Sequence, residues 1–182
     1  MKQNRLENLY AELEALCSRT ANELSQNLVK GEGNLNSAVV FVGEAPGMEE
    51  DIQRRPFVGT AGKILNSALA SAGWKRNEVF ITNIVKCRPP KNRPPRKDEI
   101  QLFLPYLNKE LEIIQPKATC LLGATATRAL TGKRLAEVRG KMFEIGGRKY
   151  FSTYHPAALI YNKSFESPFF EHIGLFRRIM EG

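Results

Sequence analysis

Cysteine is scarce in this 182-residue chain, and its spacing excludes two classes of site. The three cysteines, Cys17, Cys87 and Cys120, form no CxxC pair. Paired cysteines at short spacing are typical of the disulfide frameworks of small secreted domains and of zinc ribbons. We therefore expect neither kind of site, and we expect the thiols to be reduced.

Long apolar runs and targeting segments are also absent. No run approaches the roughly 20 apolar residues with which a helix crosses a bilayer. Residues 1–16 mix lysine, arginine and glutamate among leucines, unlike a secretory signal or a transit peptide. There is no internal repeat and no low-complexity segment. These absences predict one soluble domain over residues 1–182, in the cytoplasm and associated with the nucleoid, without membrane contact.

Acidic residues are the minority, because 27 lysines and arginines stand against 19 aspartates and glutamates, a formal net charge of +8. Such an excess is typical of proteins that meet the phosphate backbone of nucleic acids, and it also favours solubility. Basic residues gather in the proline-rich segment 86–97, which we predict to be a rigid positive loop. The charge pattern alone leaves open whether this loop contacts phosphates or is simply solvated.

What the chain does contain is an alternation of short apolar strands and amphipathic helices. Leucines at helical spacing predict one or two helices over residues 3–29, with a break near residues 17–20. The order strand, helix, strand predicts right-handed crossovers and a mainly parallel α/β sheet. Strands are predicted at 37–42, 79–85, 118–122, 141–145 and 148–152, and helices at 60–72, 98–114, 123–130 and 168–180.

Polar or flexible features stand where these strands end, which is the edge at which open α/β sheets bind ligands. Gly43-Glu44-Ala45-Pro46-Gly47 follows the first strand, Asn83 ends the second, and His155 follows the last. The glycines permit close approach of a flat ligand, and a side-chain amide offers both a donor and an acceptor. Each feature also has a structural interpretation, as a turn, a buried hydrogen bond or a packed histidine. The other histidine, His172, is expected on the surface of the last helix.

Two further features lie close to the first loop. Glu49, Glu50 and Asp51 form an acidic cluster that either orients water and steadies positive charge on a sugar, or is solvated. Phe57 either stacks on a base, which is worth about 1 to 3 kcal/mol, or belongs to the core. A phosphate loop is excluded, because the first glycine of GxxxxGK(S/T) would fall on Phe57 and its last position holds Ile64.

Taken in order, the motifs resemble those of one known family. GEAPG, EED, RPFVGTAGKILN, VFITNIVKCRPPKNRPP, VRGK and YHPAAL stand in the order and spacing of the thermostable, family 4 type of uracil-DNA glycosylase. The resemblance covers residues 31–162, most of the chain. It implies a three-layer α/β/α sandwich with a central, mainly parallel four-stranded sheet. It also implies hydrolysis of the N-glycosidic bond of uracil in single- or double-stranded DNA, the first step of base excision repair. We expect the protein to be a monomer.

The family pattern implies how the base is recognised. Duplex DNA hides the glycosidic bond, so the uracil must be flipped out of the stack. Phe57 would then stack on the uracil, and Asn83 would read its Watson–Crick edge. Glu44 would lie near C5, where it excludes the methyl group of thymine.

The same pattern implies an electrostatic form of catalysis. His155 and the backbone N–H groups of the first loop, with Gly43 and Ala45 in contact with the base, would stabilise negative charge on the departing uracil. A strong base is not needed, because the sugar that remains is an oxocarbenium-like electrophile. Glu50 or Asp51 would only orient the attacking water.

Contacts with DNA are implied for a wider set of residues. Basic side chains would grip phosphates beside the lesion, and an apolar side chain after the His-Pro turn would wedge into the vacated stack. These residues are Lys86, Arg88, Lys91, Arg93, Arg139, Lys141 and, as the wedge, Leu159, with Ile160 as an alternative.

One departure from the family concerns its [4Fe-4S] cluster, which four cysteines hold. Cys17 and Cys87 stand at or within a residue of two ligand positions, but Thr20 and Phe103 occupy the other two. Cys120 falls in the third strand and is expected to be buried. Two thiolates cannot hold a cubane that normally takes four. We therefore expect no cluster and no metal, and apolar packing around Phe103 and the N-terminal helix in its place.

Two alternatives to uracil excision stay open. Glu44 and Asn83 do not alone fix specificity, so an enzyme of the same fold could act on other deaminated bases such as hypoxanthine. An inactive nucleic-acid-binding relative could have lost activity together with the cluster. The presence of His155, Asn83 and Glu44 argues against such a loss, because drift would not spare the pocket selectively.

Overall fold

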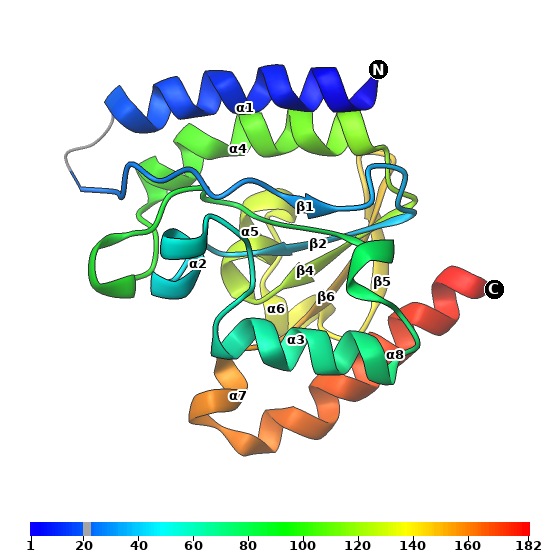
Figure 1. Ribbon diagram of the computed structural model, residues 1–182. Helices are drawn as coiled ribbons and strands as arrows, with labels where there is room; N and C mark the ends of the chain where they lie inside the picture. Colours follow the sequence, from blue (N-terminus) through cyan, green and yellow to red (C-terminus); the bar gives the residue numbers. More distant parts are fainter. Residues whose placement is uncertain (20–22) are drawn as a thin grey trace.

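The computed structural model describes residues 1–19 and 23–182, which form a six-stranded sheet between two layers of helices (Figure 1). The strand order is β1-β3-β2-β4-β6-β5. β3, β2, β4 and β6 pair in parallel, and β1 and β5 are antiparallel edges. The strands are β1 (Glu32–Gly33), β2 (Val39–Gly43), β3 (Phe80–Asn83), β4 (Ala118–Leu122), β5 (Met142–Ile145) and β6 (Arg148–Thr153).

Helices cover both faces of the sheet. α1 (Lys2–Arg19) and α4 (Lys97–Ile114) lie side by side on one face together with α5 (Ala124–Thr131) (Figure 1). α3 (Thr60–Ser71) and α8 (Glu166–Glu181) pack on the other face. Short helical segments connect these layers: α2 (Met48–Gln53), α6 (Leu135–Val138), α7 (Ala158–Tyr161) and the 3-10 turns η1 (Arg76–Glu78), η2 (Pro90–Asn92) and η3 (Lys163–Phe165).

The central strands read as apolar runs because both of their faces are covered. All five residues of β2 are buried. Val40 and Val42 join the core beneath α1 and α4, whereas Val39 and Phe41 join the core beneath α3 and α8. Alternate side chains of a strand point to opposite faces, so a strand buried twice has no polar side.

The expected α/β/α sandwich is confirmed, but the expected count of four strands is wrong. Four parallel strands do form the centre, with antiparallel β5, a strand expected at 141–145, at one edge and antiparallel β1, which was not expected, at the other. β1 consists of Glu32 and Gly33 alone, which is too short for a pattern of alternating polarity. None of the described helices combines the length and the apolar character that spanning a bilayer requires.

The prediction of helix up to residue 29 is also wrong. α1 ends at Arg19, and Leu24 and Leu28 are buried without belonging to a helix. Their segment pairs with the loop after β3 instead, since Ser25 N donates to Arg88 O at 2.9 Å and Val29 N donates to Lys86 O at 2.8 Å. The leucine spacing therefore does not mark a helix here, and Leu24 and Leu28 pack against the core from a non-helical segment.

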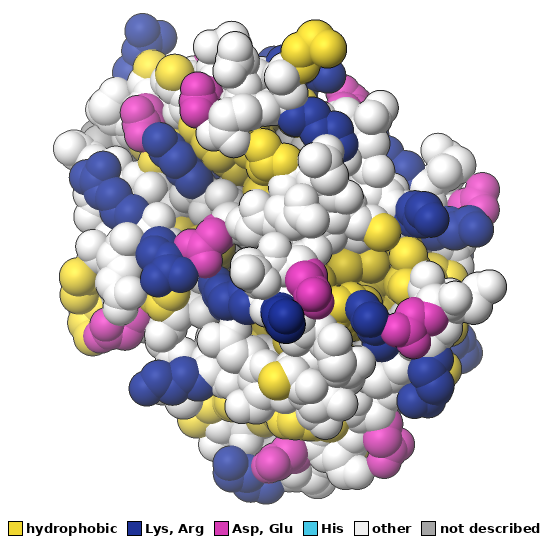
Figure 2. All heavy atoms as spheres, turned by 45° about the vertical axis from the view of Figure 1, so that its right-hand side comes forward, with side chains coloured by type: hydrophobic (Ala, Val, Ile, Leu, Met, Phe, Trp, Pro, Cys, Tyr) yellow, Lys and Arg dark blue, Asp and Glu magenta, His cyan; other side chains and the backbone are white. Residues whose placement is uncertain are grey.

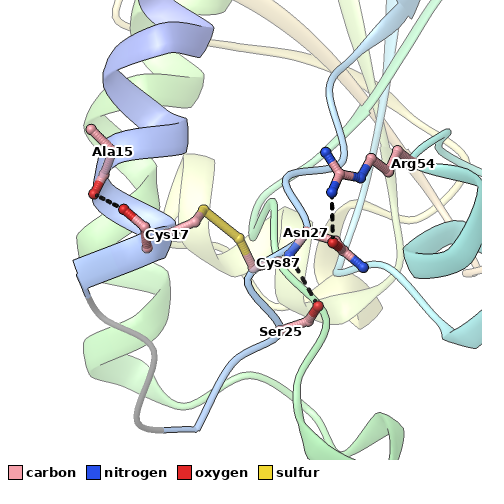
Figure 3. Close-up of a disulfide and its surroundings, with 7 residues drawn as sticks. Ala15, Cys17, Ser25, Asn27, Arg54 and Cys87 are labelled. Carbon is pink, nitrogen blue, oxygen red and sulfur yellow. Dashed lines mark hydrogen bonds between the residues drawn. A yellow bond between two sulfur atoms is a disulfide. The ribbon is translucent and has the colours of Figure 1, made fainter.

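The expectation of reduced thiols fails for two of the three cysteines. Cys17 and Cys87, 70 residues apart, form a disulfide. Figure 3 shows the Cys17 side chain reaching from the end of α1 to Cys87 in the loop after β3. No short-range motif announces this pair, because only the packing of α1 beside that loop brings the two residues together. Cys120 is free and buried in β4, as expected, and burial raises the pKa of its thiol.

Lys86 is not a phosphate contact, contrary to what the family resemblance implied. Its side chain is completely buried, and Nζ donates to Glu110 Oε2 at 2.5 Å and to the hydroxyl of Thr82. Glu110 also accepts a hydrogen bond from the hydroxyl of Tyr10 on α1. Burial lowers the pKa of Lys86, and the charge of Glu110 opposes that shift. The residue therefore joins α1, β3 and α4 inside the molecule.

Replacing Lys86 with methionine should lower the free energy of unfolding by about 3 to 5 kcal/mol, because the Glu110 carboxylate is left buried without its cation. Chemical denaturation measures this change. The double variant Lys86→Met/Glu110→Leu should recover much of the loss, since no charge is then stranded. A single variant as stable as the parent would contradict the buried pair.

Candidate functional site

A cavity of about 420 Å³ opens at the carboxyl ends of the parallel strands. Its size lies within the usual range of small-ligand pockets. Its walls come from the loop after β2, α2, the start of α3, the end of β3, the proline-rich loop and the turn after β6. Among the predicted residues, the structure brings together at this cavity Glu44, Ala45, Glu50, Phe57, Asn83 and His155.

Gly43 lies behind the cavity rather than in its wall. A Cβ atom at this position would stand 2.4 Å from Cζ of Phe57 and 2.5 Å from Oδ1 of Asn83. Both distances are far below van der Waals contact, so only glycine lets β2 end this close to the two side chains. The close approach that we expected between Gly43 and a ligand is therefore made with the pocket residues themselves.

Phe57 has an unusual backbone. Its φ is 51°, in the left-handed region that a non-glycine residue adopts at a cost of about 1 to 3 kcal/mol. The ring is 4% exposed and its centroid lies 5.7 Å from that of the His155 ring, with 31° between the planes. Phe57 thus belongs to the core, as one of the two interpretations of the sequence has it, and it also lines the cavity wall.

Asn83 presents a buried acceptor that has no partner within the described part of the chain. The residue is 4% exposed and lines the cavity, and its Oδ1 makes no hydrogen bond. A buried polar atom without a partner costs about 1 to 3 kcal/mol. This arrangement fits an acceptor that is reserved for a donor on a ligand.

His155 is held as a neutral ring with a defined tautomer. Its Nδ1 accepts a hydrogen bond from the backbone N–H of Ala157 at 3.1 Å, which leaves the proton on Nε2. Burial lowers the pKa of His155 to about 4, against the opposing effect of the Glu50 charge. The ring is partly open to the cavity and otherwise enclosed. Near neutral pH it can therefore donate from Nε2 without carrying charge.

The acidic side chains are fixed by different partners. Glu44 Oε2 accepts a hydrogen bond from Thr125 Oγ1 at 2.5 Å, a partner on α5 that no motif revealed. Glu50 is buried, and its Oε1 accepts from the backbone N–H groups of Val58 at 3.2 Å and Gly59 at 3.0 Å. These bonds hold each carboxylate in one place at the edge of the cavity.

Glu49 belongs to the wall of this cavity, but Asp51 does not. The buried Oδ1 of Asp51 has no hydrogen-bond partner among the described residues. On the helix α2 successive side chains point in different directions, so the three acidic neighbours cannot all face one site. The alternative in which Asp51 orients water is therefore not supported.

The predicted basic contacts divide into free and occupied side chains. Lys91 is exposed, and its backbone φ is 54°. Its loop is stiffened by the prolines and by a hydrogen bond of 2.7 Å from Arg88 Nε to Asn92 Oδ1. Arg93 lines the cavity, but its Nη2 donates to Glu99 Oε1 at 2.6 Å. On the face that Figure 2 shows, basic side chains lie scattered among acidic ones rather than in one continuous patch. The net charge is therefore not confined to the predicted loop.

The other predicted contacts lie around the turn after β6. Arg139 is exposed and stands over the ring of Tyr154, 4.6 Å from its centroid, and Lys141 is exposed. His172 is half-buried rather than on the surface. Its Nδ1 lies 2.9 Å from Thr153 Oγ1. Its ring stacks on the ring of Tyr154, with 6.1 Å between the two ring centroids. The position of His172 in the last helix could not reveal that its side chain faces the sheet.

Leu159 is not available as a wedge, because it is 1% exposed and packs in the core beneath α8. The single turn of α7 directs the next two side chains outward instead. Ile160 is 44% exposed and Tyr161 is 89% exposed, and Tyr161 also lines the cavity. Within an unbroken apolar run, the sequence carries no signal that separates the buried member from the exposed ones.

The residues present do not fit a four-cysteine cluster. The sulfur atoms of Cys17 and Cys87 are bonded to each other, and Phe103 is fully buried among apolar side chains. Thr20, predicted to replace another ligand, lies outside the described residues. Residues 1–19 and 23–182 contain no group of three or more histidine, cysteine, aspartate or glutamate side chains able to hold a metal.

Comparison with known proteins adds a family and several relatives. Residues 30–173 match the family model of the uracil DNA glycosylase superfamily. A type-4 uracil-DNA glycosylase of Saccharolobus solfataricus is 47% identical over 148 residues, 75% of this chain and 68% of that protein. Another from Thermotoga maritima is 46% identical over 144 residues, 77% and 75% of the two chains. A third, from Pyrobaculum aerophilum, is 40% identical over 161 residues, which are 83% of this chain and 82% of that protein.

Proposed function

This chain belongs to the uracil DNA glycosylase superfamily, and on that premise we propose that it hydrolyses the N-glycosidic bond of uracil in DNA and leaves an abasic site. The observation that carries the proposal is that one cavity is lined by both Asn83 and His155: the buried Oδ1 of Asn83 has no hydrogen-bond partner among the described residues, and the ring of His155 is neutral near pH 7. We further propose a single domain over residues 1–182 that acts as a monomer in the cytoplasm.

Recognition requires a flipped base inside the cavity. Asn83 Oδ1 would accept from N3–H of uracil while its Nδ2 donates to O4, which supplies the missing partner. Phe57 would stack on the base. Glu44, fixed by Thr125, would stand beside C5 and exclude the larger thymine.

Catalysis would depend on hydrogen-bond donors that are already in position to stabilise the charge that develops on the leaving base. The bond between C1′ and N1 breaks, and its electron pair leaves with the base as a uracil anion. The Nε2–H group of His155 and the amides of the first loop would stabilise that anion at O2. Water then adds to C1′ of the oxocarbenium-like sugar and releases a proton. Glu50, held by two backbone amides, would orient this water and offset the positive charge.

The direct test uses oligonucleotides that contain one uracil, as single strands and as duplexes, followed by alkaline cleavage of abasic sites. We expect a cleavage product from uracil and none from matched oligonucleotides that contain thymine. A hypoxanthine oligonucleotide tests the alternative substrate. Absence of product from every uracil substrate would refute the proposal.

For the phosphate clamp we propose Lys91, with support from Arg88, Arg93, Arg139 and Lys141. Lys91→Ala should reduce the slope of log K against log salt for DNA binding by about 1, because one fewer counterion is released. Lys149→Ala is the control, since Lys149 is exposed at the beginning of β6, away from the carboxyl ends of the strands. Equal slopes for Lys91→Ala and the parent would exclude Lys91 from the clamp.

For the wedge we propose Ile160 and Tyr161 in place of Leu159. They extend from the turn that carries His155, and their side chains are already outside the core. An apolar or aromatic side chain inserted between base steps compensates for the stacking lost when a nucleotide is flipped. The support for this proposal is their exposure beside the mouth of the cavity.

We also propose that the protein functions without an iron-sulfur cluster. The disulfide between Cys17 and Cys87 and the packing of Phe103 would hold α1 to the loop after β3. Protein purified without added iron should be colourless and should still give the cleavage product from uracil-containing oligonucleotides in the assay above. Absorbance at about 400 nm together with bound iron would contradict this.

A further inference from the structure

We infer that Arg76 is a positioning residue that sets the ring of Phe57 against the base, an inference that rests on the proposed function. Arg76 begins η1, between α3 and β3, and its side chain is 21% exposed. Nη1 donates to Phe57 O at 3.0 Å, and Nη2 donates to Pro56 O at 2.5 Å. Arg76 does not line the cavity, so its influence on a bound base passes through Phe57.

The contact matters because Phe57 needs external support. Its φ of 51° is unfavourable for a residue with a Cβ atom, and such conformations persist only where the surroundings enforce them. Arg76 binds the carbonyl oxygens of the two peptide groups that flank Phe57. Glu50 accepts from the N–H groups of Val58 and Gly59, and the N–H of Val58 belongs to the same peptide group as Phe57 O. The peptide groups flanking the ring are thus held by opposite charges from two separate elements.

The start of α3 closes the remaining space around this turn. A Cβ atom at Gly62 would stand 2.0 Å from Phe57 O, so the helix packs directly on the carbonyl that Arg76 binds. Nη1 of Arg76 also donates to Asn66 Oδ1 at 2.9 Å, one turn further along α3. The guanidinium group therefore links the Phe57 turn to the helix that follows it.

The edge strand β1 supplies the counter-ion. Glu32 Oε1 lies 3.4 Å from Nε of Arg76, and Oε2 lies 2.6 Å from Nε of Arg55. Arg55 is 53% exposed, and the hydrogen bonds of its guanidinium group go to Glu32. The two arginines share one carboxylate, but only Arg76 reaches the carbonyl groups of Pro56 and Phe57. Arg55 is therefore a matched control for the loss of an ion pair to Glu32.

The first part of the test measures single-turnover excision of uracil. Arg76→Met should lower the rate at least about 10-fold and weaken inhibition by free uracil by about the same factor. Arg76→Lys, which can reach one carbonyl group, should fall between, and Arg55→Met should stay within about twofold of the parent. In a Phe57→Ala background, Arg76→Met should change the rate less than about twofold, because both changes act through one ring. An equal loss in both backgrounds would overturn the inference.

The second part measures amide hydrogen exchange and does not depend on activity. Arg76→Met should speed exchange in residues 56–62 at least about 10-fold, and Arg55→Met should not. If the parent excises no uracil, the proposed function fails while this measurement still tests the role of Arg76. Unchanged exchange in Arg76→Met would overturn that role even if uracil is excised.

Discussion

Replacing His155 with alanine is expected to lower the single-turnover rate of uracil excision about 100- to 1000-fold. The loss follows from removing one preorganised donor aimed at charge that develops on the leaving base, and losses of this size are typical of such donors. DNA affinity should change little, since the ring acts on the departing base. His172→Gln is the control, because the other histidine bonds Thr153 outside the cavity. Full activity of His155→Ala would refute the proposed mechanism.

The pH profile distinguishes a neutral donor from a charged one. Because burial lowers the pKa of His155 to about 4, the folded enzyme keeps this ring neutral at pH 6 to 8. The excision rate should therefore not fall with rising pH through about 6.5, the ordinary pKa of histidine. A decline centred there, absent from His155→Ala, would mean that the imidazolium is the active form.

Replacing Asn83 with leucine is expected to lower excision at least about 100-fold without lowering the melting temperature. The rate falls because an apolar side chain cannot satisfy the N3–H and O4 groups of uracil, and sites built for hydrogen bonding reject unmatched partners strongly. Stability should hold or rise, because the substitution removes a buried acceptor that has no partner among residues 1–19 and 23–182.

Thermal unfolding and single-turnover kinetics of Asn83→Leu together check this result. Thr119→Val is a useful comparison, since Thr119 is buried in β4 and is not part of the cavity wall. It should leave the excision rate within about threefold of the parent. If Asn83→Leu lost activity and stability together, the amide would have a structural role in place of recognition.

The fold was largely predictable because its signals are local. The limits of β4 at Ala118 and Leu122 agree with the prediction, since a buried strand in a parallel sheet is a short apolar run between breaks. Glu44, Asn83 and His155 could be expected to meet, because parallel strands bring their carboxyl ends to one edge. The edge strand β1 escaped prediction because two residues carry no periodicity.

The sequence by itself determined the class of fold, the edge that holds the cavity and the family. Only the tertiary structure decided which members of a run face inward. Lys86 and Lys91 belong to one basic segment, yet the first is buried against Glu110 and the second is exposed. Leu159 and Tyr161 differ in the same way.

Contacts between residues far apart in the chain could not be predicted from the sequence, for a related reason. The disulfide of Cys17 with Cys87 and the bonds from Arg76 to the Phe57 turn join segments that no motif connects. Composition and spacing report the propensities of neighbouring residues. The direction of a side chain and its distant partner depend on how whole elements pack.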